Sequence, residues 1–158
     1  MLTTNNTLTL LDLSDNEIGG FIDGPVGHRG PHSGYPWKTT PEGPAALADG
    51  LKANTGVQQL HAKSNGLRAA GAQAFGEALK TNNTLTFLDL SGNEIGGFNT
   101  GPSYDLKFTA TPEGPAALAD GLKANSVVQQ LNVSSNSLDQ SSKDELTKQK
   151  PPQLTLNM

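Results

Sequence analysis

The sequence predicts an α/β fold, a solenoid in which short parallel strands alternate with helices along a stack of similar repeats. The first observation behind this prediction is a near copy. The segment "NNTLTLLDLSDNEIGG" at residues 5–20 returns as "NNTLTFLDLSGNEIGG" at residues 82–97. The second is a strand pattern that occurs four times, and the third is a helical stretch between successive strands. One such repeat cannot bury its apolar side alone, so each copy needs a similar neighbour.

The strand pattern reads apolar-x-x-apolar-x-apolar-x-x-Asn-x-apolar. It occurs at residues 8–18, 57–67, 85–95 and 128–138. Apolar residues two positions apart, as Leu88 and Leu90 are, face one side of a short strand. The asparagine after the strand can hydrogen-bond the backbone of the turn through its amide. These asparagines are Asn16, Asn65, Asn93 and Asn136. We expect the patterned residues to be framework.

Helices are predicted between the strands. They cover residues 41–54, 69–82 and 112–125, and the first and third have the same sequence, "PEGPAALADGLKAN". In the first helix, Pro44, Leu47 and Leu51 fall on a single helical face. Thr40 is placed to be the N-cap of this helix, with Pro41 as its first residue.

Gly50 lies within the first predicted helix, at the position where the middle helix has Ala78. Glycine costs about 1 kcal/mol of helix propensity relative to alanine. A close helix–helix approach would justify that cost.

The repeats resemble the leucine-rich repeat, whose signature is L-x-x-L-x-L-x-x-N-x-L. The uninterrupted unit runs 28 residues from Asn65 to Asn93 and looks like the ribonuclease-inhibitor class, shared by NOD-like receptors and Ran GTPase-activating proteins. The resemblance covers roughly residues 2–138. It implies a leucine-rich-repeat solenoid, a short right-handed horseshoe with a parallel sheet on the concave face and helices on the convex face.

Two repeats are longer than this unit, with insertions near residues 21–40 and 98–111 that we expect to form loops at one rim. Both begin with Phe after Gly-Gly, share Gly-Pro and later place Tyr before Lys, so they look like diverged copies. They hold most of the aromatic residues of the chain: Phe21, Tyr35, Trp37, Phe98, Tyr104 and Phe108.

These rings have two interpretations. Rim loops on a rigid scaffold commonly carry recognition, and Tyr, Trp and Arg are frequent anchors, which points to Trp37 and Arg29. Alternatively the rings fold down and pack each loop onto its own repeat, which we expect of Phe21 and Phe98.

The two ends of the array are irregular. We expect about four repeats over residues 1–138, followed by a polar tail or cap over residues 139–158. Within that tail, "DQSSKDELTKQK" could form a short closing helix, and "PPQLTLNM" could add a last strand. "MLTTNNT" aligns with residues 78–84, so the chain looks like a fragment of a longer array.

Composition excludes several classes. The net charge is −4, with 15 acidic and 11 basic residues, so the chain lacks an electrostatic footprint for nucleic acid or an anionic membrane. It has no cysteine for a disulfide or a thiolate metal site, no apolar run of membrane-spanning length and no secretion signal. A cytoplasmic location is the default expectation.

We expect no metal or cofactor. His28 and His32 have metal-ligand spacing for a helix, but Gly30 and Pro31 between them break the helix that this spacing requires. The stretch "GPVGHRGP" lacks the Gly-Lys-Ser/Thr end of a phosphate loop.

Two rows of solvent-facing positions are predicted to cross the concave sheet. One row is Asp12, His61, Asp89 and Asn132, with Lys63 one step along the strand of His61. The other row is Leu10, Gln59, Phe87 and Gln130. The first row is either an acid–base or binding spot or a polar surface with favourable charge pairing, and the exposed Phe87 and Leu10 are either a partner patch or scattered surface apolarity.

The two copies differ at only two positions, where Leu10 becomes Phe87 and Asp15 becomes Gly92. Both positions are expected to face solvent, so function is expected where the copies disagree.

The function predicted is a non-enzymatic module that binds a protein partner. The candidate binding residues are Leu10, Asp12, Arg29, Tyr35, Trp37, Gln59, His61, Lys63, Phe87, Asp89, Tyr104, Gln130 and Asn132. The alternative implied by the resemblance is a GTPase-activating regulator of a small Ran-like GTPase, whose arginine finger would be Arg29 or Arg68. A hydrolase built on His61 would need a nucleophile that the sequence does not offer, and no catalytic residue is assigned.

Overall fold

The computed structural model describes residues 2–22, 37–100 and 104–158. A short 3₁₀ helix η1 (Leu2–Thr4) precedes four α-helices, α1 (Glu42–Ala53), α2 (Arg68–Leu79), α3 (Glu113–Ala124) and α4 (Gln140–Gln149). The strands are β1 (Leu10–Asp12), β2 (Gly20–Ile22), β3 (Trp37–Thr39), β4 (Gln59–His61), β5 (Phe87–Asp89), β6 (Gly97–Thr100), β7 (Lys107–Ala110), β8 (Gln130–Asn132) and β9 (Thr155–Asn157). None of the helices within these described ranges is both long and apolar enough to cross a membrane.

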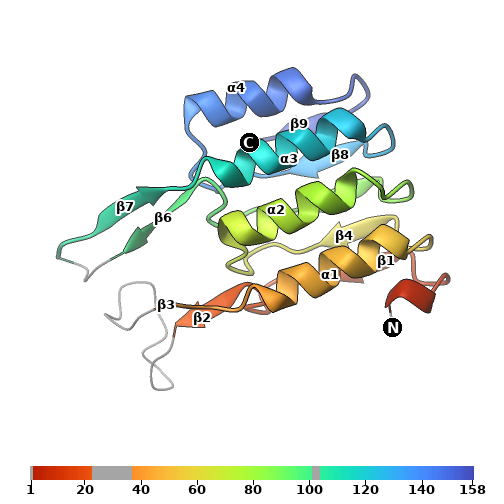
Figure 1. The fold of residues 1–158 in the computed structure, drawn as a ribbon, viewed down its shortest axis with the longest axis horizontal. Helices are drawn as coiled ribbons and strands as arrows, with labels where there is room; N and C mark the ends of the chain where they lie inside the picture. Colours follow the sequence, from red (N-terminus) through yellow and green to blue (C-terminus); the bar gives the residue numbers. More distant parts are fainter. Residues whose placement is uncertain (1, 23–36, 101–103) are drawn as a thin grey trace.

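The strands and helices form the two faces of a solenoid. Five parallel strands pair in the order β1-β4-β5-β8-β9. The four α-helices lie side by side along one face of this sheet (Figure 1). The predicted α/β leucine-rich-repeat solenoid is therefore confirmed, with a parallel sheet on one face and helices on the other.

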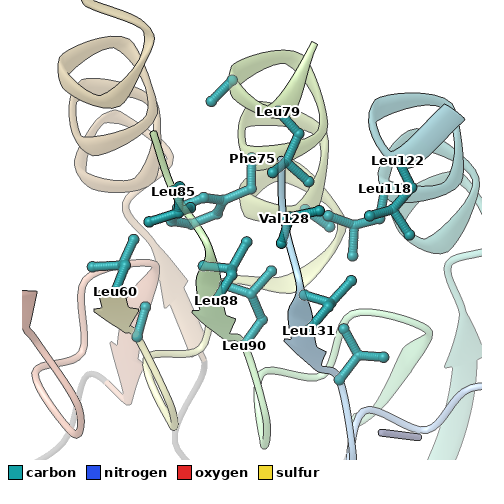
Figure 2. Close-up of a cluster of buried hydrophobic side chains, with 14 of the residues drawn as sticks. Leu60, Phe75, Leu79, Leu85, Leu88, Leu90, Leu118, Leu122, Val128 and Leu131 are labelled. Carbon is teal, nitrogen blue, oxygen red and sulfur yellow. The ribbon is translucent and has the colours of Figure 1, made fainter. Parts of the chain in front are cut away.

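Stacked leucines fill the space between the sheet and the helices. Leu60, Leu88 and Leu131 occupy one register position of successive strands, and all three are fully buried. Phe75 of α2 and Leu118 of α3 cover them from the helix side (Figure 2). Full burial of one such side chain contributes about 1.5–3 kcal/mol. The patterned leucines are thus the framework that the sequence predicted.

The asparagines of the pattern form a ladder along the turns that follow the strands. Asn93 Oδ1 accepts hydrogen bonds from the backbone N–H groups of Asn65 (2.8 Å) and Leu67 (3.4 Å) in the preceding repeat. Its Nδ2 donates to Ala62 O and Leu90 O, both at 2.9 Å. Asn65 and Asn136 repeat this arrangement, and all three side chains are buried. The predicted role of these asparagines is confirmed, and each one ties its own repeat to its neighbour.

A second asparagine ladder, which the sequence analysis missed, lies at the other end of the strands. Asn82 Oδ1 accepts from the N–H groups of Thr84 and Leu85, and its Nδ2 donates to Leu51 O at 2.7 Å. Asn54 and Asn125 occupy the equivalent positions and bond in the same way. The recurring "LKAN" and "LKTN" at the helix ends carried this signal.

One of the two differences between the copies reflects backbone geometry. Asp15 and Gly92 both have left-handed backbone, with φ of 59° and 66°. Glycine adopts this region without the steric cost that a β-carbon brings, and aspartate tolerates it better than most residues. The left-handed turn therefore accommodates both residues, and the expectation that this difference marks function stays a prediction.

Close helix packing explains the glycines of the repeated helix. A β-carbon added at Gly121 of α3 would lie 2.5 Å from Gly76 O of α2, so the two helices approach as closely as glycine allows. At Gly50, the equivalent residue of α1, the nearest atoms belong to the Leu2 side chain, at 3.1 Å. For Gly50 itself the close neighbour is η1, whereas the close approach of two α-helices occurs at the equivalent Gly121 of α3.

The predicted cap of α1 is wrong. Helix α1 begins at Glu42 after Pro41, and no side chain caps its N-terminus. The Thr40 hydroxyl instead donates to Ile18 O at 2.9 Å, and the Thr111 hydroxyl donates to Ile95 O at 2.8 Å before α3. This hydrogen bond joins the start of the helix to the preceding turn, so the hydroxyl stabilises the repeat and does not cap the helix.

The described parts of both insertions are antiparallel hairpins rather than irregular loops. Strand β2 pairs with β3, and β6 pairs with β7. Both hairpins project from the same side of the array (Figure 1). Trp37 and Phe108 occupy equivalent positions in the two hairpins. Gly20 pairs with Thr39 and Gly97 pairs with Ala110, and each aromatic residue lies two positions before that partner.

Residues 139–158 continue the stack. Asp139 caps α4, its Oδ1 accepting from Ser142 N at 2.8 Å, and Leu146 and Leu154 are buried. Strand β9 adds a fifth parallel strand beside β8. The closing helix and last strand suggested by the sequence are both present.

Candidate functional site

The candidate site is the solvent-facing side of the five-stranded sheet, which we call the open sheet face. Two rows of side chains cross it in strict register, and each gains a fifth member from β9. The first row is Leu10, Gln59, Phe87, Gln130 and Thr155, and the second is Asp12, His61, Asp89, Asn132 and Asn157. The strand order thus brings together the sheet residues that the sequence predicted, with Lys63 exposed just beyond His61.

Three members of the second row also hold their own turns. Asp12 Oδ1 accepts from Ser14 N and Asp89 Oδ1 accepts from Ser91 N, both at 2.9 Å. Asn132 does the same for Ser134 N at 3.1 Å. The backbone hydrogen bond from Ser14 is the largest cause that lowers the pKa of Asp12, and the nearby His61 adds to it. One side-chain oxygen of each of these three residues therefore holds the turn that follows its strand.

His61 contacts an aromatic ring rather than a carboxylate. The register places it between Asp12 and Asp89, as predicted. Among the residues described here, however, it forms no salt bridge with either. Its ring lies against that of Phe87, with centroids 4.8 Å apart and planes at 34°. The pair sits near the centre of the open sheet face and joins its two rows. Sequence reasoning missed this contact because it runs diagonally between neighbouring strands.

The second hairpin carries three aromatic residues, Phe98, Tyr104 and Phe108. Tyr104 is 90% exposed and Phe108 is 56% exposed. A β-carbon at Gly97 would collide with the Phe108 ring, so that ring lies directly over the glycine of the partner strand. Phe98 folds down instead, and the guanidinium carbon of Arg68 lies 3.8 Å from the centre of its ring. The packing expected of Phe98 is therefore present, although its partner belongs to the preceding repeat.

Arg68 is held at the base of this hairpin. Its Nε lies 3.0 Å from Glu94 Oε2, and its side chain is largely buried. Burial is the largest influence on its pKa and lowers it, while Glu94 opposes that shift. An arginine fixed between a ring and a carboxylate has a structural role, which argues against its use as an arginine finger.

The remaining predicted residues lie elsewhere in the fold or outside the described residues. Arg29 and Tyr35 lie outside the described residues, as do His28 and His32. Trp37 begins β3, opposite Ile22. Over the described ranges, no group of three or more His, Cys, Asp or Glu side chains is placed to hold a metal ion.

Comparisons with known proteins agree with the geometry. A family model described as "Leucine Rich repeat" matches residues 4–20 and 81–97, which include both of the near-identical segments in full. The chain is 30% identical over 105 residues to leucine-rich repeat-containing protein 45 of Gallus gallus. That alignment covers 66% of this chain and 14% of the relative, so the chain spans a small part of the relative's length. Two segments of the chain therefore match the leucine-rich repeat, in agreement with the solenoid that the structure shows.

Proposed function

We propose that this chain of leucine-rich repeats binds a polypeptide partner on its open sheet face and performs no catalysis. One observation carries the proposal. Ten side chains stand in two registered rows on five parallel strands, with the His61–Phe87 pair near the centre. Stacked repeats create an extended surface of this kind, and repeat proteins use such surfaces for binding.

The composition of the face suits a protein interface. Adjacent strands lie about 4.8 Å apart, so five strands give rows about 19 Å long, enough for several residues of a partner. Gln59, Gln130 and Asn132 offer amides that can donate and accept hydrogen bonds around the central rings. An aromatic centre with a polar surround is typical of the part of an interface that carries most of the binding energy.

The scaffold is rigid enough to present these side chains without a large ordering cost. The two buried asparagine ladders tie each repeat to the next on both sides of the strands. A preorganised surface loses less conformational entropy on binding, which favours affinity. The exposed Tyr104 and Phe108 on the second hairpin extend the proposed surface to the rim.

The 28-residue spacing of Asn65 and Asn93 supports the ribonuclease-inhibitor-like subclass, which we propose for these repeats. No observation on the described residues favours the alternative of a GTPase regulator, because Arg68 is held by Glu94 and Phe98. We expect the chain not to stimulate GTP hydrolysis by a Ran-like GTPase. Stimulation that is lost in Arg29→Ala would overturn the proposal.

The test is capture of partners from a cell lysate by the purified chain and by three variants. Phe87→Ala removes the central ring, Tyr104→Ala removes the most exposed hairpin ring, and Lys123→Ala changes an exposed residue of α3 as a control. We expect partners to be lost with Phe87→Ala and retained with Lys123→Ala, with each variant first shown to be folded by circular dichroism. Full retention with Phe87→Ala would place the binding surface elsewhere.

A further inference from the structure

Phe87 and Asp89 present an aromatic ring and a carboxylate side by side. They alternate with the buried Leu88 along β5, so both face the open side of the sheet, about 6.6 Å apart along the strand. Asp89 Oδ1 is occupied by Ser91 N, whereas within the described ranges the carboxylate forms no salt bridge. The other carboxylate oxygen is therefore left for a partner on the open sheet face.

The chain already holds one guanidinium with this pair of groups. Phe98 and Glu94 come from one short segment, and together they hold Arg68 through its stacking on the ring at 3.8 Å and its ion pair at 3.0 Å. A planar guanidinium can stack on an aromatic face while its N–H groups reach a carboxylate, which a compact ammonium does less well. Phe87 and Asp89 offer the same two groups to solvent.

The charges around this pair favour a cation. Asp12 lies in the same row as Asp89, two strands away, and its lowered pKa keeps it ionised well into the acid range. Lys63 is the nearest cationic side chain along the strand of His61, beyond the end of β4. An acidic partner segment would be repelled by both carboxylates. A purely apolar segment would bury the charge of Asp89 without a partner, which costs free energy.

We propose that Phe87 and Asp89 form a receptor for an arginine side chain of the partner polypeptide. The guanidinium stacks on the Phe87 ring and pairs with the carboxylate oxygen of Asp89 that Ser91 N does not occupy. His61 packs against the ring and fixes its position. This inference rests on the proposed function, because it names the partner chemistry for the open sheet face.

The experiment selects a displayed library of random 15-residue peptides against the full chain. We expect the enriched peptides to share one arginine. Replacing that arginine by lysine or by the neutral isostere citrulline should weaken binding about tenfold. Asp89→Asn should weaken the arginine peptide about tenfold and the citrulline peptide much less, because the neutral ureido group brings no charge to pair with the carboxylate. Phe87→Leu should weaken both peptides, because the planar ureido group of citrulline can also stack on the ring.

The variants are chosen so that the fold survives. Asn132 accepts the Ser134 N–H in the role that Asp89 plays for Ser91, so asparagine can hold the turn at position 89. Asp120→Asn, an exposed change of the same kind on α3, is the matched control and should leave binding unchanged.

The outcomes separate the two proposals. The arginine receptor is overturned if the enriched peptides lack arginine, or if Asp89→Asn does not change their affinity. If these peptides still lose affinity with Phe87→Leu, the open sheet face remains the binding site. Binders that respond to neither change, or a library that yields no binder, would count against both.

Discussion

At the scale of single residues, the asparagine of each repeat does more than end its strand. Asn93 satisfies N–H groups of the preceding repeat and carbonyl groups on both sides, all in a buried setting. A buried polar group that loses its hydrogen-bond partner costs about 1–3 kcal/mol of stability. Because each of these side chains bonds several backbone groups, its removal leaves all of them without that partner.

Asn93→Ala should therefore lower the free energy of unfolding by about 3 kcal/mol, because several buried backbone groups lose their partners together. Asn16→Ala is the matched control. Asn16 is exposed, and its amide donates to Ser14 O alone among the described residues, so we expect a loss below about 1 kcal/mol. Urea denaturation followed by circular dichroism measures both, and equal losses would contradict the ladder.

Left-handed turn residues give a second prediction at this scale. Gly92→Ala should destabilise the chain by about 1 kcal/mol, because alanine pays a steric cost at φ of 66°. Ser135, at the equivalent turn position with φ of 57°, should respond in the opposite direction. We expect Ser135→Gly to stabilise by about 0.5 kcal/mol, the relief of strain less the entropy that glycine adds to the unfolded chain. Thermal unfolding of the two variants checks the signs, and a neutral Gly92→Ala would show that the turn relaxes.

At the scale of elements, α1 and α3 have one sequence and two environments. Gly121 faces the backbone of α2, whereas Gly50 faces a flexible leucine side chain of η1. The same substitution should therefore act differently in the two helices, which tests packing separately from helix propensity.

Gly121→Ala should destabilise the chain, by about 1–3 kcal/mol, because α3 must move away from α2 to admit a methyl group. Gly50→Ala should be neutral or stabilise by up to about 1 kcal/mol, since alanine is the better helix former and Leu2 can shift. Chemical denaturation of both variants measures the difference. Equal effects would mean that the close approach of α2 and α3 carries no energetic weight.

Helix α4 depends on an ionised cap. The hydrogen bond from Ser142 N lowers the pKa of Asp139 below its usual 3.8, so the folded state binds this proton less readily than the unfolded state. The stabilisation is complete above the unfolded pKa and is lost as the pH falls through the folded one. Asp139→Asn keeps an acceptor but does not titrate, so its melting temperature should fall less than that of the wild type between pH 6 and pH 3. Parallel melting curves would contradict the role of this cap.

The sequence predicted the elements well where the repeat pattern alone decides them. Leu60, Leu88 and Leu131, and the asparagines that follow them, were predictable because each recurs at a fixed place in its repeat. The hairpins were not predictable, because the repeat signature gives no information about insertions. The hydrogen bond of the Thr40 hydroxyl was not either, because a threonine before a helix can bond the helix N-terminus or the preceding turn. The His61–Phe87 contact could not be predicted either, since side-chain rotamers on neighbouring strands decide it.

At the scale of the whole molecule, the proposed binding function depends on the open sheet face. The helices cover one face of the sheet, and the other face carries ten side chains in register, with His61 and Phe87 near the centre. Its framework residues explain why the sequence repeats. We propose that the residues that differ between repeats along the two rows make the surface specific for its partner.

The most direct test is to map a bound peptide by NMR. Backbone amide shifts of the isotope-labelled chain are followed while a peptide selected against it is added. The account predicts that the largest changes fall on β4, β5 and β8, around His61, Phe87 and Gln130, with smaller changes on the second hairpin. Changes confined to the outer surfaces of α1 to α4 would contradict it.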